Sequence, residues 1–177
     1  MLMKAITLYQ PYASLIAVGV KRFETRSWAT NYRGPIAIHA GMKEYSADTK
    51  AGLAVWHGVV DVMGQDCWDI RALDRSIRFM EGDGRGVYHD QFPKGAMVAT
   101  AELVECYQVD RIFERSVDER IYAIFRGHQQ LTRISSHERL FGDWTPGRYA
   151  WELANVQPLP APVPALGKQG LWNWEVP

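Results

Sequence analysis

The sequence predicts an α+β domain, in which a small mixed β-barrel carries flanking helices and helical insertions. Three observations lead to this prediction: short strand-like segments recur along the chain, one helix follows the first of them, and long charged or glycine-rich stretches separate the others. The chain has 177 residues. This length suits a single domain and lets about two-thirds of the unfolded surface be buried, so the fold needs no disulfide or metal.

Strand and helix signals alternate in the first forty residues. Lys4–Leu8 is apolar enough for a short strand, and Pro11–Gly19 follows as a helix. Proline suits the first turn of a helix, and glycine commonly ends one. Phe23–Trp28 then reads as a second strand and Ile36–Ala40 as a third, largely buried one. These segments form the first half of the predicted barrel.

Two stretches interrupt the strand pattern. In the first, at about 43–92, we expect helices over 46–57 and 66–80, followed by a mobile loop at the glycine-rich residues 82–86. The second stretch, at about 107–140, is charged. We expect it to be partly helical, with Val117–Arg126 as the best helical candidate.

A capping pattern, Ser135-Ser-His-Glu138, marks a further helix start near the end of the second stretch. Both stretches are interpreted as insertions within one domain that spans residues 1–177. No internal repeat is visible in the sequence.

The remaining strands follow in the second half of the chain. Gly95–Val109 gives the clearest alternating pattern, and Tyr149–Leu153 and Gly170–Val176 are shorter strands. Between the last two, every second residue of a short stretch is proline, at Pro158, Pro160, Pro162 and Pro164. Proline lacks a backbone N–H, so we expect an extended connector that does not join the interior of a sheet.

The composition is that of an ordinary soluble globule, with 47% hydrophobic residues and 20 basic side chains balanced by 20 acidic ones. Zero formal charge argues against coating of long duplexes, although a local basic cleft is compatible with it. Cys67 and Cys106 form no CxxC pair, so neither a disulfide scaffold nor a zinc site is expected, and a reducing cytoplasm is the simplest location. No apolar run approaches the roughly 20 residues of a membrane span.

The segment Gly19–Trp28 carries the strongest chemical signal. Glu24 and Arg26 lie two residues apart, so both face the same side of a strand, and Lys21 lies where the helix turns into that strand. A carboxylate between two cations stays ionised. Such a group can hold a phosphate or the polar edge of a base. A structural ion pair at one end of the barrel explains the same pattern, so both interpretations stay open.

These residues resemble a known family. Gly19-x-Lys21-x-x-Glu24-x-Arg26 is similar to the GxKxxExR signature of ASCH domains, which belong to the PUA-like superfamily of RNA-associated barrels. Further segments resemble the family in order, namely Gln10-Pro11-Tyr12, Asn31–Pro35, Ile38–Ala40, Phe92–Ala96, Tyr149–Leu153 and Gly167–Trp172. The resemblance covers both ends of the chain and a middle segment, and misses most of 43–90 and 107–140.

The resemblance implies a PUA-like barrel with a cleft that binds RNA or a modified nucleobase, lined by the signature residues. It leaves alternatives open, because family members also serve as coactivator modules, as ribonucleases and as N4-acetylcytidine amidohydrolases. The amidohydrolases use a Lys, a Thr and a Glu. Lys21 matches the Lys, but Glu24 stands where the Thr would be, and Thr25 faces the other side of a strand.

The candidate ligand-binding residues are Lys21, Glu24, Arg26, Trp28, Tyr9, Gln10 and His39. Tyr9 and Trp28 are the candidates for stacking on a base, and His39 suits a buried core position as well as a site. If the protein is an enzyme, Glu24 would act as general base on water and Lys21 would stabilise an oxyanion. Neither a cofactor nor a metal is expected, because no histidine has a partner at ligand spacing. The expected partner is RNA, a nucleotide or a nucleoside.

Overall fold

The structure is a computed structural model that describes residues 1–44, 54–55, 58–59, 92–116, 121–126 and 129–177. Most of the described residues lie in strands, and two short helices, α1 (Tyr12–Ala17) and α3 (Ser136–Leu140), connect them. The helix predicted over 46–57 falls outside the described residues except at 54–55, which are helical. The predicted helix over 66–80 and the loop at 82–86 lie wholly outside them.

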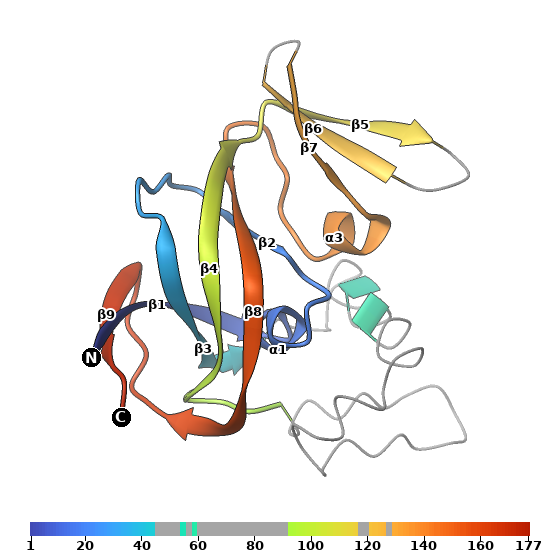
Figure 1. Ribbon diagram of the computed structural model, residues 1–177. Coiled ribbons are helices and arrows are strands. Elements are labelled where there is room, and N and C mark those ends of the chain that lie inside the picture. The colour runs from blue at the N-terminus through green and yellow to red at the C-terminus, as the bar shows by residue number, and fades with distance from the viewer. Residues whose placement is uncertain (45–53, 56–57, 60–91, 117–120, 127–128) are drawn as a thin grey trace, which may run out of the picture.

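Within the described residues, six strands form the main sheet (Figure 1), in the spatial order β2-β8-β4-β3-β1-β9. β1 and β3 run parallel, and the other neighbours are antiparallel. The bounds are β1 Leu2–Gln10, β2 Phe23–Arg26, β3 Gly34–Glu44, β4 Ala96–Gln108, β8 Tyr149–Pro164 and β9 Leu171–Glu175. The strands predicted near these positions are confirmed. β1, β3 and β8 are longer than expected, and β2, β4 and β9 are slightly shorter.

The main sheet does not close through backbone pairing in the described part of the chain, so the predicted barrel is an open, barrel-like sheet. The sheet bends enough for a side chain to link two strands that are not neighbours in it. Arg26, on the first strand of the order, donates from Nη2 to the carbonyl oxygen of Thr7 on β1, at 3.0 Å. One guanidinium therefore joins two strands that no ladder joins.

Apolar side chains cover both faces of the main sheet. On one face α1 contributes Ala13, Ile16 and Ala17 to a core that also holds Ile6, Leu8, Ile36, Ile38, Trp151 and Leu153. On the other face Ala5 and Ala37 pack with Met97, Trp172 and Trp174. Burial on both faces explains why the central strands read as nearly continuous apolar runs.

A second sheet follows β4 and contains β5 (Arg111–Ser116), β6 (Ile121–Arg126) and β7 (Gln129–Ile134). The helix predicted over Val117–Arg126 is therefore wrong at residues 121–126, which pair with strands on both sides, and residues 117–120 lie outside the described part of the chain. The sequence of β6, Ile-Tyr-Ala-Ile-Phe-Arg, is rich in β-branched and aromatic residues, which favour strands over helices. Local propensity in this case outweighs the charged context of the neighbouring residues.

The proline-rich connector is extended as predicted, but it joins the sheet. β8 continues through it to Pro164 and pairs with β4, while β2 pairs with β8 only over residues 149–152. In an extended strand every second residue directs its backbone nitrogen to the same edge. Residues between the prolines therefore keep N–H groups for β4. Directly after the last proline, the N–H of Ala165 donates to the carbonyl oxygen of Gly95 at 2.9 Å. Prolines are tolerated here because one edge of β8 carries no strand over this stretch of the described chain.

Candidate functional site

Lys21 is buried at the point where the chain leaves α1. Gly19 adopts a positive φ of 79°, and the N–H groups of Val20 and Lys21 both donate to the carbonyl oxygen of Leu15 at 3.0 Å. This tight turn directs the Lys21 side chain inward, where it is only 1% exposed. Its Nζ donates to the carbonyl oxygen of Phe23 and lies 5.7 Å from the centre of the Tyr12 ring. The ammonium group is therefore solvated by the protein itself.

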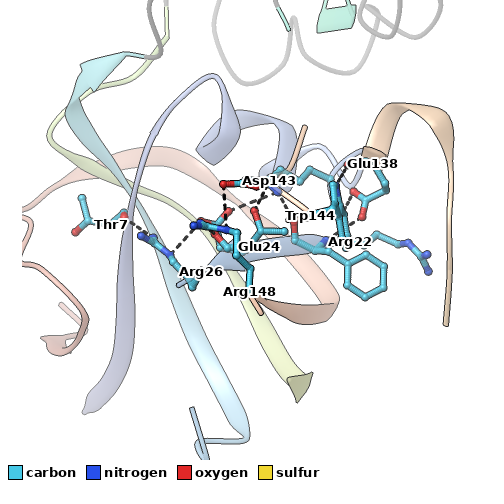
Figure 2. A network of polar contacts seen from close by, with 11 residues as sticks. Thr7, Arg22, Glu24, Arg26, Glu138, Asp143, Trp144 and Arg148 are labelled. Carbon is cyan, nitrogen blue, oxygen red and sulfur yellow. Dashed lines mark hydrogen bonds and ion pairs between the residues drawn. The ribbon is translucent and has the colours of Figure 1, made fainter. Parts of the chain in front are cut away.

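Glu24 and Arg26 face the same side of β2, as their spacing predicts, while Phe23 and Thr25 are buried on the other side. Glu24 Oε2 lies 3.5 Å from Lys21 Nζ, and Glu24 Oε1 lies 3.1 Å from Arg26 Nε. The side chains of Glu24 and Arg26 are 12% and 26% exposed. The structure thus brings the three signature charges together in the order cation, anion, cation, and only Glu24 and Arg26 reach solvent. Figure 2 shows the contact between Glu24 and Arg26.

Glu138 completes this arrangement from α3. Its side chain is 3% exposed, and its two carboxylate oxygens accept from the backbone N–H groups of Arg22 and Phe23 at 2.7 and 3.0 Å. Burial raises the pKa of Glu138, although the charge of Lys21 and the two N–H groups oppose that shift. The site therefore contains a second buried carboxylate, which sequence reasoning did not assign to it.

The capping pattern at Ser135–Glu138 was the available signal for this residue. As it predicts, Ser135 Oγ accepts from the backbone N–H of Glu138 at 3.1 Å and starts the helix. In a full capping box the Glu138 carboxylate would fold back onto its own helix start. It contacts β2 instead, and the sequence pattern gives no sign of that distant partner.

The segment after α3 contacts the side of β2 that carries Phe23 and Thr25, opposite to Glu24 and Arg26. Figure 2 labels three of its residues, Asp143, Trp144 and Arg148. The indole N–H of Trp144 donates to the carbonyl oxygen of Glu138 at 3.1 Å, and its ring packs edge-on against Phe23. The backbone N–H of Asp143 donates to Thr25 Oγ1 at 2.9 Å, and Asp143 pairs with Arg148 at 3.2 Å. These contacts hold β2 between β8 and the residues around α3.

Trp28 and Tyr9, the predicted stacking residues, lie in different surroundings. Trp28 packs edge-to-face on Trp151 at 4.6 Å, and Trp151 is the cross-strand neighbour of Glu24. Trp28 is therefore close to the charged pair. Tyr9 is 50% exposed and lies two residues beyond Thr7 on β1, so both point away from the face that carries Leu8. Tyr9 therefore does not face the core against which Trp28 packs.

Gln10 and His39 are both buried and take part in holding the fold together. The Gln10 side chain donates to the carbonyl oxygen of Pro93 at 2.7 Å and accepts from the N–H of Ser14 at 3.2 Å. His39 Nε2 lies 3.0 Å from the carbonyl oxygen of Ala165, and its ring packs against Trp172 on the sheet face opposite α1. Of the seven candidates, the structure brings Lys21, Glu24 and Arg26 into one group with Trp28 beside it.

The described residues contain no group of three or more His, Cys, Asp or Glu side chains arranged to hold a metal ion. No described helix is both long and apolar enough to cross a membrane.

Comparison with known proteins gives the same family as the signature. The family model of the ASCH domain matches residues 6–162, which is most of the chain. Activating signal cointegrator 1 of Homo sapiens and that of Mus musculus are each 27% identical to it over 114 residues. This match covers 64% of the chain but 16% of either relative. With most of its length matched by this family model, the chain belongs to the ASCH domain family.

Proposed function

We propose that this ASCH domain binds single-stranded RNA and receives one base at the exposed edge of the Glu24–Arg26 pair. The observation that carries the proposal is the partly exposed ion pair, in which Glu24 Oε1 and Arg26 Nε lie 3.1 Å apart. A carboxylate next to a guanidinium offers acceptors and donors side by side, which complement the polar edge of a base. Unpaired bases in single strands present those edges.

The neighbouring residues have supporting roles in this proposal. Lys21 is too deeply buried to contact a phosphate, so it holds the Glu24 carboxylate in place through the 3.5 Å contact. Trp28, packed on Trp151 beside the pair, provides an aromatic surface for the base. Gln10 and His39 belong to the fold, because their polar groups already contact backbone atoms.

Fluorescence anisotropy with a labelled single-stranded RNA of about ten nucleotides tests the proposal. Glu24→Gln and Arg26→Gln should each weaken binding about tenfold or more, since hydrogen bonds to charged groups contribute about 1.5–3 kcal/mol. Glu102→Gln and Arg33→Gln are the matched controls, because these residues form contacts with Asn155 and Glu105 on other strands. Unchanged affinity in both site variants, or no binding by the wild type, would overturn the proposal.

The same site carries an enzymatic hypothesis, in which Glu24 activates water and Lys21 stabilises an oxyanion. Lys21 Nζ lies 3.5 Å from Glu24 Oε2, but its side chain is only 1% exposed, which favours the binding role over this one. Incubation with N4-acetylcytidine or single-stranded RNA, with and without Mg²⁺, distinguishes hydrolysis from binding. A product that forms with the wild type and is lost in Lys21→Ala would make this an enzyme. Binding without product keeps the proposal above.

A protein-interaction role is the second candidate function, and the match to proteins named activating signal cointegrator favours it. The chain spans about a sixth of those relatives, so their roles come to it only as a hypothesis. The absence of both RNA binding and turnover in the two experiments would favour this candidate.

A further inference from the structure

Five arginines lie around β2, although the chain as a whole has no formal net charge. They come from three separate parts of the sequence: β2 and the residue before it, β7 with α3, and the start of β8. We call them the arginine surface, and its members are Arg22, Arg26, Arg133, Arg139 and Arg148. The fold, and not a local basic run, brings these positive charges together.

Several contacts show that the three parts meet. Arg22 donates from Nη2 to the carbonyl oxygen of Arg133 at 3.4 Å, which joins β2 to β7. Arg148 donates from Nη2 to the carbonyl oxygen of Thr25 at 3.4 Å, which joins the start of β8 to β2. Figure 2 shows Arg22, Arg26 and Arg148 along β2.

Asp143 links the remaining arginine to this group. Burial by itself would raise the pKa of Asp143, but hydrogen bonds from Thr145 and the charges of Arg148 and Arg139 outweigh it, so the pKa is lowered. Arg139 lies on α3 directly after Glu138, whose carboxylate contacts the backbone at the start of β2. Arg148 contacts the Asp143 carboxylate directly, at 3.2 Å.

The carboxylates in these segments neutralise only two of the five arginines, Arg26 and Arg148. Glu138 is buried and occupied by backbone N–H groups, and Glu24 is shared between Lys21 and Arg26. Asp143 pairs with Arg148. In the part of the chain that the structure describes, no ion pair joins the exposed side chains at positions 22, 133 and 139. Three exposed guanidinium groups therefore lie around the strand that carries the proposed base site.

We propose that the arginine surface binds the phosphates that flank the base held at Glu24–Arg26, so that the ligand is a strand of RNA and not a free nucleoside. This inference rests on the proposed function. Arginine suits the role because its planar fork binds phosphate oxygens in a bidentate way. A local cluster on a neutral protein fits a short strand better than a long duplex, which needs a broad basic face.

The double variant Arg133→Gln/Arg139→Gln tests the inference, since both residues lie outside the Glu24–Arg26 pair. Binding of a labelled ten-nucleotide RNA would be measured across a series of salt concentrations, and binding of free cytidine and uridine by NMR. The logarithm of the binding constant falls linearly with the logarithm of the salt concentration, and each phosphate contact on a single strand contributes about 0.7 to the steepness of that line. Loss of two contacts should therefore reduce the steepness by about 1.4. Nucleoside binding should stay unchanged. Lys43→Gln, at an exposed lysine on β3, is the control.

The outcomes separate the two proposals. A wild type that binds RNA, with the same slope and affinity in the double variant, overturns the arginine surface and leaves the proposed function standing. A wild type that binds neither RNA nor nucleoside overturns the proposed function. Competition by a ten-residue poly-glutamate peptide as effective as that by RNA would overturn the inference in favour of an acidic protein partner.

Discussion

Lys21 and Glu138 hold the backbone of Phe23 from its two ends. The ammonium group of Lys21 donates to the carbonyl oxygen of Phe23, and the carboxylate of Glu138 accepts from its N–H at 3.0 Å. Both side chains are almost completely buried. The start of β2, and with it the direction of Glu24, therefore depends on two opposite charges from distant parts of the chain.

Replacing Lys21 with Met should destabilise the fold by about 3 kcal/mol. The substitution removes the positive charge beside Glu24, whose carboxylate is mostly buried and would keep only its contact with Arg26. Phe23 also loses the donor to its carbonyl oxygen. Urea unfolding measures the change, with Lys43→Met as an exposed control that should stay within about 0.5 kcal/mol of the wild type. The double variant Lys21→Met/Glu24→Gln should lose less than the two single losses added together. Equal stability of Lys21→Met and wild type would contradict this account of the site.

Glu138→Gln should reveal a pH-dependent contribution to stability. Burial raises the pKa of Glu138 in the folded chain, so protonation there is easier than in the unfolded chain. The stability that this group contributes is complete below its unfolded pKa and is lost as the pH rises through the folded pKa. The unfolding free energy of the wild type minus that of the variant should therefore fall as the pH rises above about 4, the ordinary range of a glutamate. Urea titrations of both proteins measure it, and a difference that grows with pH would contradict the shift.

The sequence predicted well those features that depend on near neighbours. Pro11 and Gly19 bracket the α1 region, and the spacing of Glu24 and Arg26 puts both on one face of β2. The signature residues identified the family that the comparison confirms. Local patterns carry this information because helix ends and strand faces are set within a few residues.

The features that were missed depend on distant contacts. Glu138 reads as part of a helix cap, and only the packing of α3 against β2 gives it the N–H groups of Arg22 and Phe23. The proline-rich part of β8 reads as a connector, because its pairing with β4 depends on which edge of the strand the prolines face. In both cases the residue type permits two structures, and tertiary contacts select one.

His39 should titrate below its ordinary pKa. Burial lowers the pKa, and the hydrogen bond to Ala165 opposes that shift. For a base with a lowered folded pKa, the stabilising contribution is present above the unfolded pKa of about 6.5 and is lost as the pH falls through the folded pKa. Proton NMR of the imidazole measures the midpoint of its titration. As the pH falls through that midpoint, His39→Phe should lose less unfolding free energy than the wild type. A midpoint above that of a free histidine would refute the prediction.

Arg26 should be required to keep β2 close to β1, since no backbone ladder joins them in the described sheet. Its guanidinium lies 3.1 Å from Glu24 through Nε and donates to Thr7 through Nη2, in two directions that one ammonium group cannot match. Both Arg26→Lys and Arg26→Gln should therefore speed hydrogen exchange of the β2 amides, by about tenfold if about 1.4 kcal/mol of local stability is lost.

The comparison between these two variants shows which property of Arg26 matters. Arg33→Lys, at an arginine that pairs with Glu105 away from β2, should leave exchange in β2 unchanged. If Arg26→Lys protects the amides as well as the wild type does, positive charge alone holds the two strands together and the link to Thr7 is dispensable. If both variants exchange faster, the fork of the guanidinium joins the strands, and the same residue then serves the fold and the proposed base site at once.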